Sequence, residues 1–276
     1  MGETEFLNYL LTKGLSDETL KVYIHYYRKF VLIKEALGVT LTQDFANTFL
    51  SEYHNIVARA MLQNLLEHEG IHNVRIAKIT GRKKKRHTIL ITPEHQEELR
   101  TYFYDKRIDL GLMFDLSSYG ALRRAEVINI KPRDFNIREA TLNKDAPASL
   151  RIIGKGDKER KVIIPRLLLK ATLMYAQSME KQMDDKLFDM GKTRWWQLFH
   201  KACLKLGYTY KDKKGKVCSL YHPHSIRHTT SSAWWEKGTD ITRIQRRLGH
   251  SSVATTQLYL TPDEKKEELE WAKEYQ

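Results

Sequence analysis

The chain has 276 residues, of which 41% are hydrophobic and 10% aromatic, and this composition excludes a wholly disordered protein. No apolar run reaches the roughly 20 residues of a membrane span, and the two cysteines, Cys203 and Cys218, are too few for a disulfide framework. A formal net charge of +13 favours a polyanionic partner.

The basic charge is concentrated in one part of the chain. Residues 81–262 contain 36 Lys and Arg against 19 Asp and Glu. A solvated surface explains many single charges of this kind, but it is a weaker explanation for an excess of positive charge of this size over one region. The first five residues include two glutamates, Glu3 and Glu5, where a secretory signal has a basic stretch and an apolar core, which predicts a cytoplasmic protein without a membrane partner.

The first 80 residues predict a small bundle of four helices. A short helix over 6–11 ends near Gly14, and Ser16, followed by two acidic residues, opens the second helix. Apolar residues of the second helix have the i, i+3 and i+4 spacing of a buried stripe: Tyr23, Ile24, Tyr27, Phe30 and Val31. The remaining helices are expected over 43–52 and 56–68.

A basic linker separates this unit from the rest of the chain. It contains five consecutive cations, Arg82, Lys83, Lys84, Lys85 and Arg86. Thr92 then supplies a helix N-cap and Pro93 the first helical position, which together are a strong helix start. The expected organisation is a helical domain over 1–80, a linker over 81–92 and a second, mostly helical domain over 93–276.

One β-rich patch interrupts the helical pattern of the second domain. The apolar segments 150–153 and 161–164 flank a Gly-Lys-Gly-Asp sequence at 154–157, which suits a hairpin turn. A short strand near 135–137 could join this sheet. The predicted fold class is therefore mainly α with a small antiparallel β-sheet.

His224 and Arg227 form the first candidate site. Pro223 is tolerated only in the first turn of a helix, so both residues lie near a helix N-terminus, and their spacing puts them on one face. The free N–H groups and the positive dipole end favour an anion there, which makes the pair a candidate phosphate site. Because His-x-x-Arg often occurs by chance, a purely structural role is the alternative.

Three further segments have the same character. Arg123 lies in the first turn of a helix, with Glu126 one turn on, after a glycine that ends the preceding helix. Lys155 lies between two glycines of the hairpin loop, which let the backbone fold around a ligand. His250 follows a helix-breaking glycine, and a short helix after it carries Tyr259. The ordinary alternatives are a surface ion pair, a solvated turn lysine, a junction histidine and a core aromatic.

Taken in chain order, these residues resemble the tyrosine recombinases, also called phage-type integrases. The full set is Arg123, Lys155, His224, Arg227, His250 and Tyr259. The segments 121–126 and 154–160 are similar to the family's Gly-Leu-Arg-x-x-Glu and Gly-Lys-Gly-x-Lys-x-Arg patterns, with Ala121 where glycine is usual. Residues 6–30 are similar to the core-binding domain of Xer-like members, so the resemblance covers nearly the whole chain.

The resemblance implies a two-domain clamp on double-stranded DNA and strand transfer through a 3′-phosphotyrosyl intermediate. Tyr259 is then the nucleophile, and Lys155 is the acid that protonates the leaving 5′-oxygen. The family also implies a homotetramer on two DNA sites, with a C-terminal helix over 262–275 as a docking element; covering its own domain is the alternative. The five linker cations are expected to contact DNA phosphates.

The chemistry of the other residues agrees with this assignment. Arg123 and Arg227 suit the non-bridging phosphate oxygens, because guanidinium forks make paired, charge-assisted bonds there and take the place of a metal. A tyrosine hydroxyl has a pKa near ~10 and needs a base, for which His224 is the candidate. His250 either bonds the phosphate or steadies the site. No cofactor is expected.

Rival interpretations are weaker. A metal-dependent nuclease would use His222, His224, His228 and the cysteines, but no Asp or Glu cluster adjoins them, and magnesium chemistry on DNA requires carboxylates. A non-catalytic DNA-binding protein satisfies the charge but leaves the ordered residue set unexplained. A type IB topoisomerase shares the chemistry but not the N-terminal unit. The expected function is Xer-like recombination, or integration and excision of a mobile element, by a nucleoid-associated enzyme.

Overall fold

The computed structural model describes residues 2–53, 55–76, 89–143, 147–154, 159–212, 214–257 and 260. The chain divides into two compact units, residues 1–85 and 86–276. Some predicted features lie outside the described residues, namely the linker cations at 82–86, Lys155, Tyr259 and the helix over 262–275. Among the described residues, no helix is both long and apolar enough to cross a membrane.

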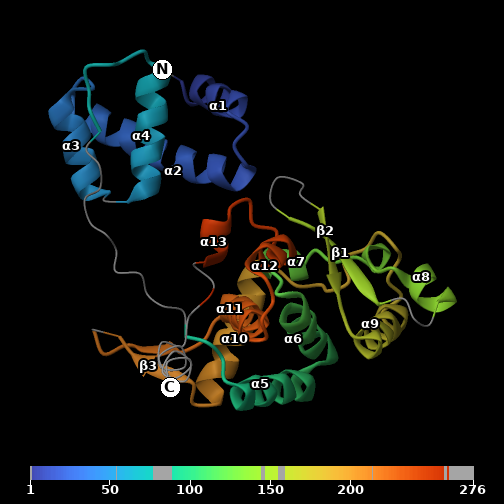
Figure 1. Cartoon of the computed structure of the whole chain (residues 1–276). Helices are drawn as coiled ribbons and strands as arrows, with labels where there is room; N and C mark the ends of the chain where they lie inside the picture. The colour runs from blue at the N-terminus through green and yellow to red at the C-terminus, as the bar shows by residue number, and fades with distance from the viewer. Residues whose placement is uncertain are drawn as a thin grey trace, which may run out of the picture. The chain divides into compact units, whose positions relative to one another are not determined.

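The described part of the first unit is helical (Figure 1). Its helices are α1 (Glu3–Thr12), α2 (Asp17–Leu37), α3 (Gln43–Glu52) and α4 (Ile56–His68). The predicted bounds of α3 and α4 are confirmed, and Ser16 is the N-cap of α2 as predicted. Helix α1 begins earlier than Phe6, with Gly2 as its N-cap, because two glutamates in its first turn favour the positive end of the helix dipole.

Aromatic rings form the core of the first unit. The Phe30 ring contacts those of Phe45 and Phe49, with ring centroids 5.2 and 5.3 Å apart. The predicted stripe on α2 is buried at Tyr23, Ile24, Tyr27 and Phe30. Val31 is only partly buried. Burying a phenylalanine contributes about 2 kcal/mol, so these contacts are what makes each short helix stable.

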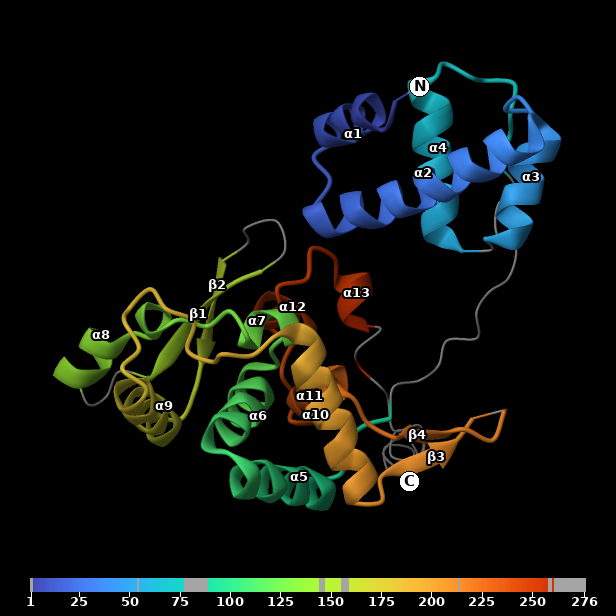
Figure 2. The same cartoon turned by 180° about the vertical axis from the view of Figure 1, so that it is seen from behind.

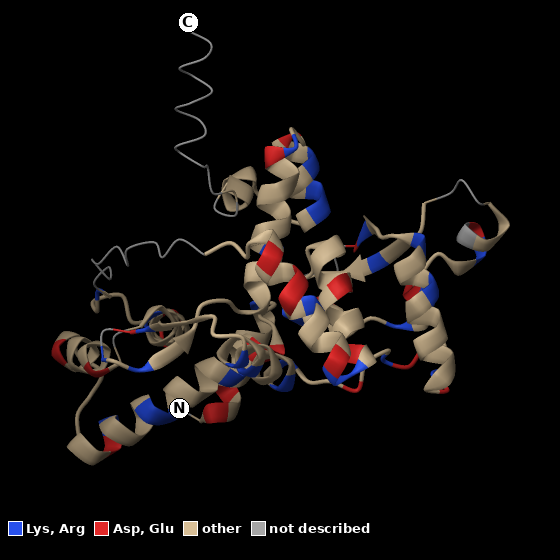
Figure 3. Ribbon diagram, turned by 90° about the horizontal axis from the view of Figure 1, so that it is seen from below, with Lys and Arg blue, Asp and Glu red and all other residues tan. Residues whose placement is uncertain are grey.

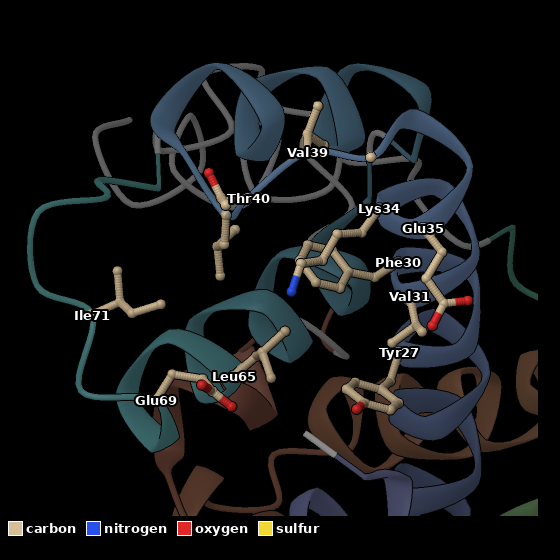
Figure 4. A pocket seen from close by; sticks show the side chains of 12 residues that line it. Tyr27, Phe30, Val31, Lys34, Glu35, Val39, Thr40, Leu65, Glu69 and Ile71 are labelled. Carbon is tan, nitrogen blue, oxygen red and sulfur yellow. The ribbon is translucent and has the colours of Figure 1, made fainter.

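A cavity of about 560 Å³ lies beside this core (Figure 4). Phe30 and Leu65 are among its lining residues, and Lys34 directs its ammonium group into it. None of the lining residues belongs to the predicted site. The cavity is therefore a feature of the first unit alone.

The second unit is organised around α6. Its helices are α5 (Pro93–Lys106), α6 (Ile108–Gly120), α7 (Arg124–Val127), the 3₁₀-helix η1 (Pro132–Asp134), α8 (Ile137–Leu142), α9 (Arg166–Ser178), α10 (Lys192–Lys205), α11 (Pro223–Glu236), α12 (Ile241–Leu248) and α13 (Val253–Gln257). Helix α6 contacts α5, α9 and α11, and residues 109–118 are all buried. Because it is enclosed, its apolar residues occur on all sides of the helix and not along one stripe.

The predicted hairpin is present. Strands β1 (Ser149–Ile153) and β2 (Glu159–Ile163) pair antiparallel, with Ser149 opposite Ile163 and Ile153 opposite Glu159. Figure 2 shows both strands beside α9, away from α10. The mainly α fold with small antiparallel sheets is thereby confirmed.

The predicted third strand near 135–137 is wrong. Phe135 forms a single bridge to Leu150, and α8 begins at Ile137. The cause is Asn136, whose side-chain oxygen accepts the Ser149 N–H at 2.6 Å while its own backbone N–H donates to the Ser149 carbonyl at 3.1 Å. The Asn136 side chain thus takes the Ser149 N–H, a donor that a continuing strand would need for its backbone, and the strand pairing ends there.

A second hairpin was not predicted. Strands β3 (Thr209–Lys211) and β4 (Val217–Ser219) pair antiparallel. The turn between them is closed by Asp212, whose carboxylate accepts the N–H groups of Lys214 and Lys216 at 2.8 and 3.0 Å. The strands are short and mostly exposed, so their sequences lack the alternation of apolar and polar residues that would predict them.

Basic and acidic residues are interspersed over the described part of the chain (Figure 3). Arg100 pairs with Asp115 at 2.9 Å, and Lys181 pairs with Asp189 at 2.8 Å. Part of the positive charge counted in the sequence is therefore neutralised within the second unit.

Candidate active site

The N-terminus of α11 carries the predicted pair His224 and Arg227. His222 is the N-cap, and its ring nitrogen Nδ1 accepts the Ser225 N–H at 3.2 Å. The Ser225 hydroxyl in turn accepts the His222 N–H at 3.2 Å. With Pro223 at the first helical position, these bonds place His224 in the first turn and Arg227 one turn later, near the helix N-terminus as the sequence predicts.

Arg227 is fully buried, and its guanidinium joins three segments. Its Nη1 donates to the carbonyl of Ala121 at 2.7 Å, just after α6. Its Nη2 donates to the carbonyl of Leu248, the last residue of α12, and contacts His250 Nε2 at 3.1 Å. A buried charge is tolerated only with such partners, so the guanidinium is held in one place before any ligand arrives.

Arg123 is the N-cap of α7 and is bound to Glu126, one turn on. Its Nη1 donates to Glu126 Oε1 at 2.8 Å, and its backbone N–H donates to Oε2 at 2.7 Å. The Arg123 side chain is 30% exposed, whereas that of Glu126 is 4% exposed. The pair is therefore not the surface ion pair of the ordinary interpretation, because its acid is buried.

Glu126 also binds Arg160, the last residue of the segment 154–160, which was not among the predicted site residues. Arg160 on β2 donates from Nη1 and Nη2 to the two Glu126 oxygens at 2.9 and 2.7 Å. Arg227 Nη1 lies 3.8 Å from Glu126 Oε2. Burial raises the pKa of Glu126, but the hydrogen bond and the charge of Arg160 and the bonds from Arg123 outweigh it and lower the pKa to about 2.

The sequence contains a signal that Arg160 is buried. Arg160 lies two residues before Val162, so the alternation of side chains along the strand puts both residues on the same face, and both are buried. An arginine at such an inward position needs a buried acid.

His250 follows Gly249, whose left-handed conformation (φ +66°) ends α12. Its Nδ1 lies 3.0 Å from the hydroxyl of buried Thr256, a residue the sequence analysis did not single out. Because Arg227 donates to Nε2, the neutral imidazole carries its proton on Nδ1 and donates it to Thr256. Burial, and then the charges of Arg227 and other arginines, lower the pKa of His250 to about 4.

His224 lies among other imidazoles. Its ring centroid is 5.2 Å from that of His228 and 6.4 Å from that of His222. Burial, followed by the charges of His228 and Arg227, lowers the pKa of His224 to about 3. At neutral pH the ring is therefore uncharged and able to accept a proton.

The structure brings four of the six predicted catalytic residues together in one network. They are Arg123, His224, Arg227 and His250. Lys155 and Tyr259 lie outside the described residues, but Leu260 packs against the small cluster of Ala121, Ile244 and Leu248, and the Ala121 carbonyl accepts a bond from Arg227. Within the described ranges, no group of three or more His, Cys, Asp or Glu is arranged to hold a metal ion.

The chain is similar to known proteins along most of its length. A model of the phage integrase family matches residues 90–266. The tyrosine recombinase XerA of Thermococcus onnurineus is 28% identical over 271 residues, covering 92% of this chain and 88% of that protein. The tyrosine recombinase XerC of Haemophilus ducreyi is 35% identical over 154 residues, covering 55% of this chain and 46% of that protein.

Solved structures share the fold. A crystal structure of XerA recombinase aligns with a TM-score of 0.53 at 20% identity, covering 99% of this chain and 97% of that one. The XerH site-specific recombinase bound to a palindromic difH substrate, in a post-cleavage complex, aligns with a TM-score of 0.63 at 20% identity, covering 92% and 77%.

Proposed function

The chain belongs to the phage integrase family and is a tyrosine recombinase of the Xer-like kind, and from this premise we propose which residues carry its reaction. It cleaves and rejoins DNA strands at specific sites. The observation that carries the residue assignment is the fully buried Arg227 guanidinium, bonded to the Ala121 and Leu248 carbonyls and in contact with His250.

Arg123 and Arg227 bind the non-bridging oxygens of the scissile phosphate. Arg227 is held by protein atoms in advance, so little reorganisation is needed when negative charge develops in the transition state. Arg123 is partly exposed and bonded to Glu126 through Nη1, so its other N–H groups can turn toward a phosphate. Two positive groups, of which Arg227 is held in advance, then stabilise the five-coordinate phosphorane.

The histidines act in their neutral forms. His224, with its pKa lowered to about 3, accepts the proton of the Tyr259 hydroxyl. His250 steadies Arg227 through Nε2. A bound phosphate brings negative charge beside the arginines and raises the pKa of both rings, which strengthens His224 as a base.

The step balances without an external energy source. The Tyr259 oxygen forms a bond to phosphorus, the bond from phosphorus to the 5′-oxygen breaks, and Lys155 gives that oxygen a proton. Rejoining is the reverse reaction with the 5′-hydroxyl of another strand. Because the phosphotyrosyl bond conserves the phosphodiester, no ATP is needed.

The two units and the chain termini have distinct parts in this proposal. Residues 1–80 are a core-binding domain and residues 93–276 are the catalytic domain. The linker 81–92 joins the two domains, which together hold the duplex as a clamp.

Four protomers assemble on two sites, and the segment 262–275 docks on a neighbouring protomer. Truncation after Thr261 should then spare DNA binding and abolish strand exchange. Binding to chromosomal DNA associates the enzyme with the nucleoid.

A nicked suicide substrate in EDTA tests the residue assignment. The wild type should form a protease-sensitive covalent adduct at a 3′ end, because Tyr259 is trapped when the 5′ fragment dissociates. Tyr259→Phe should bind the DNA and form no adduct. Arg123→Ala and Arg227→Ala should cleave about 10²–10³-fold more slowly, the usual effect of removing one preorganised donor.

Two outcomes would reject this proposal. An adduct formed by the Tyr259→Phe variant would show that another residue is the nucleophile. Cleavage that stops in EDTA and survives loss of Tyr259 would instead identify a metal-dependent nuclease.

A further inference from the structure

Arg160 is a charged residue at a core-facing position of the β1–β2 hairpin. Its side chain is 7% exposed, while its strand neighbours Glu159 and Lys161 are exposed. Burying a guanidinium costs several kcal/mol unless its hydrogen bonds are satisfied. The residue is therefore held in the core by specific partners.

Its partners belong to two different segments of the site. Nη1 and Nη2 make the fork to Glu126 on α7, and Nε donates to the Arg247 carbonyl in the last turn of α12 at 2.8 Å. The next carbonyl, that of Leu248, is bonded by Arg227. Two arginines thus cap the C-terminal end of α12 directly before His250.

Glu126 transmits the position of Arg160 to Arg123. Its Oε1 accepts one bond from each of these two arginines, and its Oε2 accepts one bond from Arg160 and one from the Arg123 backbone. Removing Arg160 would leave Glu126 with half of these bonds. The carboxylate, and with it the Arg123 guanidinium, would then be free to reorient.

We propose that Arg160 is a positioning residue of the recombinase, which locks the hairpin, Arg123 and the segment leading to His250 into one catalytic arrangement. The proposal rests on the residue assignment made above. It follows from geometry, because this single side chain bonds both segments from a strand that adjoins the loop carrying Lys155. A displacement of about 1 Å in such a site typically costs on the order of 10²-fold in rate.

The first test compares Arg160→Met with Arg160→Lys on the suicide substrate. Methionine keeps the volume and removes the charge, so adduct formation should fall about 10²-fold while DNA affinity stays within about threefold. Lysine restores the charge without the fork and should recover part of the rate. Arg151→Met on β1 is the matched control, because Arg151 is 41% exposed and its ion pairs are with Asp134 and Glu159, outside the network of Glu126.

A pH profile separates positioning from general stability. The charged groups that face Glu126 are Arg123, Arg160 and Arg227, and the titratable neutral group is His250. Without Arg160 the pKa of Glu126 rises, so its protonation at acid pH releases Arg123. As the pH is lowered, the cleavage rate of Arg160→Met should therefore begin to fall at a higher pH than the cleavage rate of the wild type does. An identical profile would overturn the proposal.

The double variant Glu126→Gln/Arg160→Met covers the case in which Arg160→Met folds poorly. Removing both charges leaves no unpaired carboxylate in the core, so the protein should regain thermal stability. Positioning predicts that cleavage stays about 10²-fold low. Recovery of the wild-type rate would mean that Arg160 only neutralises Glu126, and the proposal would be wrong. Absence of an adduct in the wild type would reject the residue assignment instead.

Discussion

At the scale of single residues, the site depends on unusual backbone and protonation states. Ala121 has a left-handed conformation (φ +47°), and its own carbonyl accepts a hydrogen bond from the Arg227 guanidinium. His250 is kept neutral by burial and by the arginines around it. Each of these two features has a measurable consequence.

Ala121→Gly should be nearly neutral for stability. The left-handed conformation costs an alanine about 1 kcal/mol, and the loss of its methyl, which is fully buried against Ile244 and Leu248, costs about 0.8 kcal/mol. The two effects oppose each other, so the free energy of unfolding in a denaturant titration should change by less than about 1 kcal/mol. Ala121→Val should lose about 3 kcal/mol, because a branched side chain fits neither the backbone nor the space. Equal losses in both variants would contradict this account.

The neutral state of His250 predicts a pH dependence of stability. Its pKa is lowered in the folded protein, so below about pH 6.5 the unfolded chain binds the proton and the folded one does not. The stability contribution is complete above about pH 6.5 and is lost as the pH falls toward 4, by at most about 3 kcal/mol. Unfolding titrations of the wild type and His250→Gln at pH 7.5 and 5 would measure this contribution. The difference in unfolding free energy between the two proteins should be smaller at pH 5 than at pH 7.5, and an equal difference at both pH values would refute the linkage.

At the scale of elements, helix ends bring the site together. The N-terminal end of α11 presents His224 and Arg227, and the last turn of α12 presents two carbonyls to arginines. Gly249 is essential to the second arrangement for two reasons. Its φ is +66°, and a Cβ added there would lie 3.3 Å from the Arg160 Cδ.

Gly249→Ala should therefore impair catalysis as well as stability. Gly238 is a matched control, because it also ends a helix with positive φ (+76°) but has no atom within 4 Å of an added Cβ. Both alanine variants should lose about 1 kcal/mol of unfolding free energy from backbone strain. Only Gly249→Ala should also slow adduct formation, by about tenfold or more, through displacement of Arg160. Similar cleavage rates in the two variants would mean that the contact with Arg160 is unimportant.

At the scale of the whole molecule, the two units have separate hydrophobic cores. Substitutions in the proposed linker, residues 81–92, should therefore leave both folds intact. The linker cations are the densest run of positive charge in the sequence. Their effect is expected in DNA affinity and not in folding.

Replacing the five cations Arg82 to Arg86 by alanine should weaken the salt dependence of DNA binding. Each phosphate contact contributes about 0.9 to the slope of log affinity against log salt concentration, so the magnitude of the slope should fall by up to about 4.5. Specific and scrambled duplexes should lose affinity equally, because phosphate contacts position a protein without reading sequence. Titrations at several salt concentrations measure both effects. An unchanged slope would show that the linker does not lie on DNA.

The sequence by itself determined what depends on near neighbours. The bounds of α3 and α4, the β1–β2 hairpin and the placement of His224 and Arg227 in one helical turn all follow from capping, turn and periodicity rules that act over about four residues. The failed strand at 135–137 marks the limit of these rules, because Asn136 is bonded to Ser149, thirteen residues away.

Only the tertiary structure decided which charged groups meet. The bond from Arg227 to the Ala121 carbonyl spans 106 positions, and the fork from Arg160 to Glu126 spans 34. No local preference encodes such pairs, since they form only when packing around α6 and the hairpin brings the segments together and excludes water. The sequence thus determined the kinds of groups in the site, and folding determined that Glu126 binds the arginines in a single network.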